Sequence, residues 1–151
     1  MPWLELDSIF HMQNWTPRPE AEFRAEVERF TAADGWVVDG NYSAALDLVW
    51  SRADAVVWFD LPRRTVMRRL AVRTLRRMVT GAELWNGNKE SFRFLFNKDE
   101  SILYWAWTRH ASDSERFRRA AADPANARLT FVRVASRDDF DRALRLLTDK
   151  I

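Results

Sequence analysis

Short apolar runs alternate along the chain with longer segments in which apolar residues recur every three or four positions. The runs have strand length and end in polar or turn-forming residues: 3–6, 36–38, 55–59 and 129–134. The periodic segments predict amphipathic helices at 23–33, 43–50, 63–78, 99–122 and 138–147. Strands that alternate with helices predict an α/β protein with a parallel sheet, and 151 residues fit a single domain.

Individual residues sharpen these predictions. The continuous apolar run 55–59 is typical of a strand covered on both faces. Ser43 is placed to cap the helix that follows it. In the segment 63–78 the predicted core-facing stripe is Met67, Ala71, Leu75 and Met78.

Composition narrows the class of protein. Apolar residues make up 47% of the chain and eight residues are Trp, so a sizeable core is expected. Cysteine is absent, which excludes a disulfide framework. The N-terminus has no signal-peptide pattern, and no apolar run reaches the length of a membrane span. We expect a soluble cytoplasmic protein with no membrane partner.

Arginine is concentrated in one predicted helix, where seven arginines fall between Arg63 and Arg77. Arg69, Arg73 and Arg76 share a helix face, and planar guanidinium groups match phosphate oxygens. The plainer interpretation is a solvated basic face, which we prefer for Arg63, Arg64 and Arg68.

The order of motifs resembles adenylate-kinase-like P-loop proteins, and most closely the bacterial DNA topology modulation protein family. The segments that carry the resemblance are 4–7 (LELD), 36–42 (WVVDGNY), 59–62 (FDLP) and 84–91 (LWNGNKES). The resemblance covers nearly the whole chain. It implies an ATP-dependent nucleotide or small-molecule kinase with a P-loop kinase-like fold and a lid-like segment at 80–98.

One defining motif is missing. A phosphate loop needs Gly-x-x-x-x-Gly-Lys-Ser/Thr, because glycines let backbone N–H groups surround phosphate oxygens, and no glycine here lies in that pattern. Family members begin with a strand, this loop and a helix, about 25 residues in all. In the family sheet that strand is central, between the strands matching 36–39 and 55–59. Without that central strand there are three alternatives: the two flanking strands pair directly, another copy of the chain supplies the missing strand, or the natural protein is longer. We expect the last.

Asp39 and Asp7 are the acidic site candidates. By resemblance Asp39 holds Mg²⁺ at the carboxyl edge of the sheet, and the alternative is an ordinary Asp-Gly turn. Asp7 ends the first predicted strand and by resemblance faces the phosphoryl acceptor as a catalytic base; the alternative is a cap or Asx turn. The resemblance places Asn41 and Tyr42 in the same substrate site.

The remaining candidates bind nucleotide or substrate. By resemblance Arg69 and Arg73 are catalytic and contact ATP, with Arg76, Arg77 and more loosely Arg109 as further ATP contacts. In the lid-like segment the substrate candidates are Trp85, Asn86 and Asn88, since Trp stacks and amides hydrogen-bond. A Trp that anchors the loop to the core is an equal alternative. His11 and His110 are the only histidines, so a zinc site is unsupported.

Three functions compete. The first is a P-loop phosphotransferase using ATP and Mg²⁺, for which the chain alone should show negligible phosphoryl transfer and should not bind ATP tightly. The second is a non-catalytic remnant that binds a nucleotide or a protein. The third, nucleic-acid binding by the arginine helix, is not favoured, because 22 acidic residues offset 24 basic ones. Exposed strand edges predict a homodimer or larger homo-oligomer.

Overall fold

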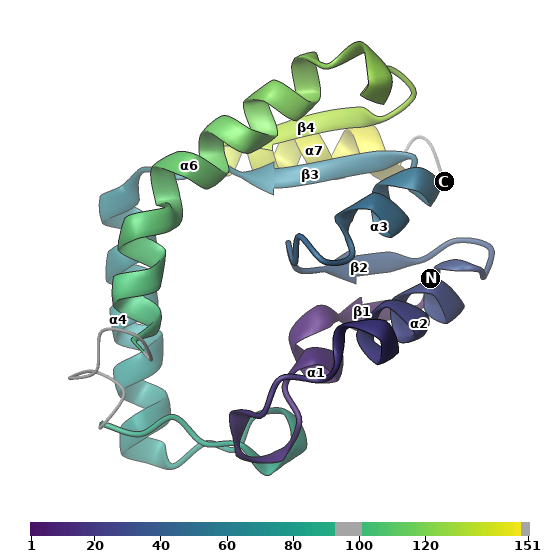
Figure 1. The fold of residues 1–151 in the computed structure, drawn as a ribbon. Helices are drawn as coiled ribbons and strands as arrows, with labels where there is room; N and C mark the ends of the chain where they lie inside the picture. The colour runs from purple at the N-terminus through teal and green to yellow at the C-terminus, as the bar shows by residue number, and fades with distance from the viewer. Residues whose placement is uncertain (93–100, 149–151) are drawn as a thin grey trace. The chain divides into compact units, whose positions relative to one another are not determined.

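The structure is a computed structural model that describes residues 1–92 and 101–148, with the side chains of residues 147 and 148 left aside. The chain falls into two compact units (Figure 1). Unit 1 comprises Met1–Ala53 and Gly81–Lys89, and unit 2 comprises Asp54–Thr80 and the chain from Glu90 onward. Residues 93–98 of the lid-like segment, and the expected helix start at Asp99 or Glu100, lie outside the described residues. The single domain expected from the sequence stays a prediction.

Unit 1 is built on two short parallel strands. Its elements in chain order are β1 (Trp3–Glu5), α1 (Leu6–Phe10), η1 (Gln13–Trp15), α2 (Glu20–Thr31), β2 (Val37–Asp39), α3 (Leu46–Arg52) and η2 (Trp85–Gly87). β1 pairs with β2 in parallel, with Leu4 opposite Val38 and Glu5 opposite Asp39. The strands predicted at 3–6 and 36–38 are therefore present, although the first gives way to a helix at Leu6.

The core of unit 1 forms where α1, α2 and α3 meet. Its buried side chains are Leu6, Phe23, Val27 and Ala45. Phe23 and Val27 are one turn apart on α2, which confirms the amphipathic pattern read from the sequence. The rings of Phe10 and Phe23 pack edge to face with their centroids 5.3 Å apart, and the centroids of the Phe10 and Tyr42 rings are 4.5 Å apart. This packing fixes the backbone on which the site residues of unit 1 stand.

Unit 2 contains the second strand pair. Its elements are β3 (Ala55–Phe59), α4 (Arg63–Thr80), α6 (Ile102–Ala122), η3 (Pro124–Asn126), β4 (Thr130–Val134) and α7 (Arg137–Thr148). β3 pairs with β4 in parallel from Ala55 opposite Thr130 to Phe59 opposite Val134. Trp58 is buried, stacked on Phe117 at 6.2 Å. α6 packs beside α4 and then along the strands (Figure 1).

The architecture is thus mixed α/β, with one parallel strand pair in each unit, where the sequence suggested one parallel sheet. Three local predictions were wrong. Ser43 does not cap α3, whose N-cap is Ala45 without a side-chain hydrogen bond. β3 is not covered on both faces, because Phe59 is 61% exposed. The expected stripe on α4 is wrong in its middle only: Met78 is buried and Met67 half-buried as predicted, but Ala71 and Leu75 are exposed and Thr74 is buried instead.

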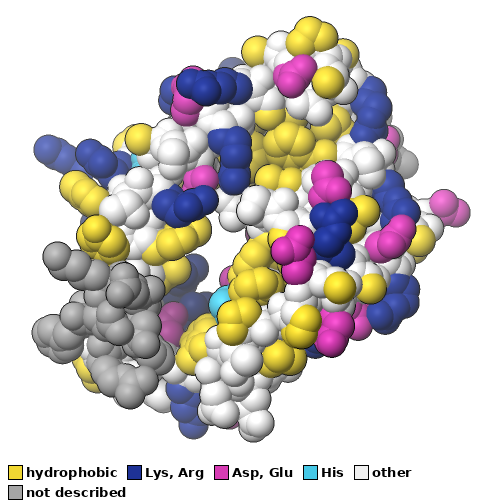
Figure 2. Space-filling model, viewed as in Figure 1, with side chains coloured by type: hydrophobic (Ala, Val, Ile, Leu, Met, Phe, Trp, Pro, Cys, Tyr) yellow, Lys and Arg dark blue, Asp and Glu magenta, His cyan; other side chains and the backbone are white. Residues whose placement is uncertain are grey.

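None of the described helices has both the length and the apolar character that crossing a membrane requires. Hydrophobic side chains are nevertheless exposed beside Lys and Arg side chains on the face drawn in Figure 2.

Candidate functional site

Three carboxylates gather at the carboxyl edge of the strand pair in unit 1. Glu5 ends β1 and Asp39 ends β2, and the parallel register sets these two residues opposite each other. Asp7 follows in the first turn of α1, so it does not end a strand as the sequence suggested. Carboxyl ends of parallel strands meet at one edge, where ligands of open α/β sheets bind.

The negative charges of Glu5 and Asp7 interact electrostatically with the carboxyl group of Asp39. The pKa of Asp39 is raised above its ordinary value, first by the partial burial of its carboxyl group and then by the negative charges of Glu5 and Asp7. The raised pKa thus reflects burial together with the negative charge that the three carboxylates concentrate at this edge.

A hydrogen-bonded chain runs from Asp7 through Tyr42 to His11. The Tyr42 hydroxyl donates to Asp7 Oδ1 at 2.5 Å and lies 3.2 Å from His11 Nε2. Burial, followed by the hydrogen bond to Asp7 and the charge of Asp7, strongly raises the pKa of Tyr42, so the phenol stays protonated. No described residue donates a hydrogen bond to the second carboxylate oxygen of Asp7, which leaves that oxygen free for a ligand.

His11 completes the chain in a half-buried position. The Tyr42 hydroxyl uses its only hydrogen to donate to Asp7. A hydrogen bond with His11 therefore requires the Nε2–H tautomer, in which His11 donates to the phenol oxygen. His11 Nδ1 is buried and has no hydrogen-bond partner among the described residues. Burial lowers the pKa of His11, and the charge of Asp7 opposes this shift.

Replacing Asp7 by Asn should therefore lower the pKa of His11 further, because the opposing charge is removed while the side chain can still accept from Tyr42. Histidine ring NMR across pH 4 to 8 measures this directly, and a His110→Gln variant assigns the two histidine signals. Asp34→Asn removes an exposed carboxylate outside this chain and should leave the His11 titration unchanged. A rise in the His11 pKa in Asp7→Asn would contradict the proposed geometry.

The turn η2 is fastened to the first turns of unit 1. Trp85 Nε1 donates to Glu5 Oε2 at 2.5 Å. The side chain of Asn86 donates to the carbonyl oxygens of Ser8 and His11, at 3.1 and 2.6 Å. Asn86 has a positive φ of 57°, a conformation that asparagine tolerates better than most residues.

Asn88 is the buried centre of this connection. Its side chain donates to the carbonyl oxygens of Met12 and Trp85, each at 2.9 Å, and accepts from the Trp15 backbone N–H at 2.8 Å. Amide groups used in this way shape the backbone around the site. Of the predicted substrate contacts, Asn86 and Asn88 therefore have structural partners, and Trp85 orients a site carboxylate. Asn41 is half-buried between Gly40 and Tyr42, next to the same edge.

The predicted arginines lie on the helices of unit 2. Arg69, Arg73 and Arg76 are exposed on α4. Arg77 forms a half-buried ion pair with Glu90 at 3.2 Å. Arg109 lies on α6 with its guanidinium carbon 5.8 Å from the centre of the Trp105 ring. The arginines thus belong to unit 2 and the carboxylates to unit 1.

Sequence reasoning missed a buried carboxylate in unit 2. Asp60 follows β3 and accepts from Arg133 Nε at 2.7 Å, from Arg118 Nη2 at 3.3 Å and from the Ser114 hydroxyl. Burial alone would raise the pKa of Asp60, but the hydrogen bonds from Ser114, Arg133 and Arg118 outweigh it and lower the pKa. The only signal in the sequence was an Asp directly after an apolar strand.

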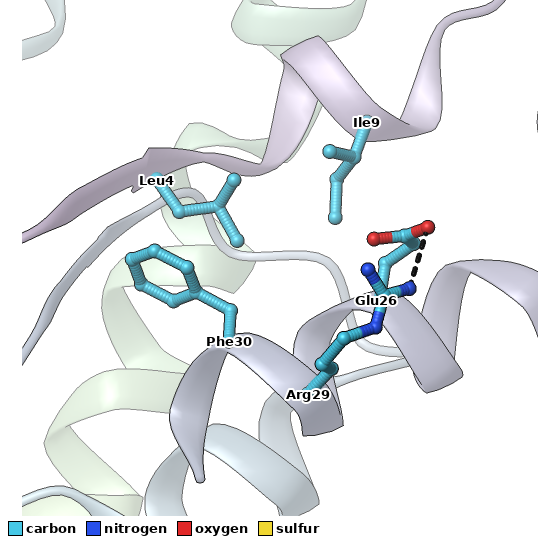
Figure 3. A pocket seen from close by; sticks show the side chains of 5 residues that line it. All are labelled: Leu4, Ile9, Glu26, Arg29 and Phe30. Atoms are coloured by element: carbon cyan, nitrogen blue, oxygen red, sulfur yellow. Dashed lines mark ion pairs between the residues drawn. The ribbon is translucent and has the colours of Figure 1, made fainter. Parts of the chain in front are cut away.

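Two hollows accompany these groups. In unit 1, Leu4, Ile9 and Phe30 line a pocket of about 230 Å³ beside the Glu26–Arg29 ion pair (Figure 3). Its volume is below that of ordinary small-molecule sites, which begin near 300 Å³. In unit 2, an open pocket of about 420 Å³ lies over Asp60, His110 and Arg133. Within residues 1–92 and 101–148, no group of three or more His, Cys, Asp or Glu side chains is arranged to hold a metal ion by itself.

Comparisons with protein-family models, with curated proteins and with solved structures found no match to this chain.

Proposed function

We propose that unit 1 binds the phosphoryl acceptor of a phosphotransferase, a small molecule with a free hydroxyl group such as a nucleoside or nucleotide. The observation that carries this proposal is the meeting of Glu5, Asp7 and Asp39 at the carboxyl edge of β1 and β2. Asp7 accepts the hydroxyl proton through the oxygen that Tyr42 leaves free. Tyr42 and His11 keep the carboxylate in position.

Phosphoryl transfer also needs a donor site. Within unit 2 taken by itself, we propose that the exposed Arg69 and Arg73 bind ATP phosphates, with Arg76 beside them. Within unit 1 taken by itself, Asp39 is the proposed ligand of Mg²⁺. One or two carboxylates together with phosphate oxygens suffice for Mg²⁺, which keeps most of its waters. Because the chain contains no phosphate-loop motif, we expect the chain alone to bind ATP weakly and to transfer no phosphoryl group.

Calorimetric titration of the 151-residue protein with ribonucleosides and nucleoside monophosphates tests the acceptor site. We expect one of these compounds to bind, and Asp7→Asn to weaken it about 10-fold, because a hydrogen bond to a charged group contributes about 1.5 kcal/mol or more. Asp34→Asn is the matched control with the same loss of charge at an exposed position, and it should bind as the wild type does.

Equal weakening in Asp7→Asn and Asp34→Asn would show a general charge effect and would contradict the acceptor site. For the donor side, Arg69→Gln combined with Arg73→Gln should weaken ATP binding, because two guanidinium groups are removed from the proposed phosphate contact. Calorimetric titration with Mg²⁺ alone should show binding to the wild type that Asp39→Asn weakens. Phosphoryl transfer by the chain alone, measured with radiolabelled ATP, would refute the expectation that the missing loop is required.

A further inference from the structure

One row of side chains on α4 is exposed along the whole helix. We call Arg64, Arg68, Val72, Leu75 and Val79 the α4 row. They follow one another at steps of four, four, three and four residues, so they lie on a single face. Its three aliphatic members are 63%, 53% and 71% exposed, and both arginines are exposed as well. The row is thus basic in its first half and aliphatic in its second.

The α4 row is separate from the face that α4 uses inside unit 2. Thr74 and Met78 are the buried residues of α4, and α4 packs against α6. Thr74 immediately precedes Leu75 and Met78 immediately precedes Val79. Because neighbouring residues point about 100° apart on a helix, the buried face and the α4 row are different faces of α4. Exposure of three aliphatic side chains in succession is costly in water unless another surface covers them.

Charge decides what can cover this row. The helix 63–80 contains seven arginines and no acidic residue. In a parallel pairing with a second copy of α4, Arg64 and Arg68 would face the same arginines. In an antiparallel pairing they would face Val79 and Leu75, which buries two cations against aliphatic groups without a carboxylate. A second copy of α4 is therefore a poor partner for the row.

Two other classes of partner match only half of the row. A membrane-bound helix separates cations and apolar residues onto opposite sides, whereas here both occur on one side, one after the other along the axis. Nucleic-acid phosphates would match Arg64 and Arg68 but would leave the aliphatic half uncovered. A protein helix with carboxylates in one half and aliphatic residues in the other matches both halves.

We propose that the α4 row is a docking surface for a helix of another protein that is acidic in one half and aliphatic in the other. The arginines steer the partner and fix its direction, and the aliphatic residues supply the buried area. This inference is independent of the acceptor site, because it uses none of the residues placed there.

The probes are two helix-stabilised peptides of about 20 residues, long enough to span α4. Both carry glutamates in one half of a face and leucines in the other half, and they differ only in the order of the halves. We expect one order to bind to the full chain, measured by fluorescence anisotropy, with affinity falling as salt rises. The opposite order should bind at least about 10-fold more weakly, because it sets leucines on arginines.

Variants locate the binding surface. Arg64→Glu combined with Arg68→Glu should abolish binding of the acidic peptide. The same variant should bind a second peptide that carries lysines in place of the glutamates. Val72→Ser combined with Leu75→Ser should weaken binding without unfolding the protein, since both side chains are exposed. The matched control is Arg145→Glu with Leu146→Ser on α7, both also exposed, which should bind as the wild type does.

Several results would overturn the proposal. They are equal binding of both peptide orders, failure of the charge exchange to restore binding, and loss of binding in the α7 control. Binding of anionic phospholipid vesicles or of duplex DNA through Arg64 and Arg68, with neither peptide bound, would assign the row to a different class of partner. Self-association that disappears in the Arg64→Glu, Arg68→Glu variant would assign it to a second copy.

Discussion

Replacing Gly40 by Ala should destabilise unit 1 by about 3 kcal/mol, a sum of backbone strain and overpacking. Gly40 has a φ of 137°, which L-residues rarely adopt, and an added Cβ would lie 2.8 Å from Leu6 Cβ. Leu6 is fully buried in the core and cannot move aside. Gly40 also joins Asp39 to Asn41 and Tyr42, so the same change should distort the candidate site.

Gly81→Ala is the matched control. Gly81 also has a positive φ, 61°, but nothing lies within 4 Å of an added Cβ, so only backbone strain remains, about 1 kcal/mol. Because the two units need not unfold together, hydrogen exchange of peptides from 1–53 is the appropriate measure for Gly40→Ala. Equal destabilisation of unit 1 by the two substitutions would show that the close approach to Leu6 does not matter.

Asp60→Ala should destabilise unit 2 by about 2–3 kcal/mol at pH 7, because the buried carboxylate holds Arg118, Arg133 and Ser114 together. The two arginines remain about half exposed and can regain water when the carboxylate is lost. We therefore expect less than the 3–5 kcal/mol typical of breaking a wholly buried pair.

The effect should depend on pH in a defined direction. The pKa of Asp60 is lower in the folded protein than its unfolded value of about 3.9. The stabilisation from its ionised form is therefore complete above about pH 4 and is lost as pH falls through the folded pKa. Urea unfolding of wild type and Asp60→Ala at pH 7 and in steps below pH 4 measures this, and a difference that grows in acid would contradict the assignment.

The sequence predicted the described strands and most of the helices because their patterns are local. Phe23 and Val27 repeat with helical period and are both buried, and the apolar run 55–59 is a strand. The burial of α4 was less predictable. Leu75 fits an apolar stripe, yet the helix buries Thr74, since the face that meets α6 is set by tertiary packing.

Sequence reasoning named Asp7, Asp39, Tyr42 and Trp85 as site candidates, but it named neither Glu5 nor His11 and did not pair these groups with one another. Asp7 and Asp39 follow apolar runs, which is a local signal. Other carboxylates have hydrogen-bond partners far along the chain. In unit 1, Trp85 is 80 residues from Glu5, and in unit 2, Arg133 is 73 residues from Asp60. No period or short motif reports such a hydrogen bond, and only the fold brings its atoms together.

The fastening of η2 to the first turns has a consequence for synthesis on the ribosome. Unit 1 is interrupted in sequence, because residues 54–80 belong to unit 2. Asn88, which donates to the Met12 carbonyl and accepts from the Trp15 N–H, is therefore made only after those residues. A nascent chain ending near residue 60 therefore contains the strands of unit 1 but leaves the Trp15 backbone N–H without its acceptor. The two long-range hydrogen bonds of Asn88 can form only after residue 88 has left the exit tunnel, so this part of unit 1 is completed after the arginine helix has been synthesised.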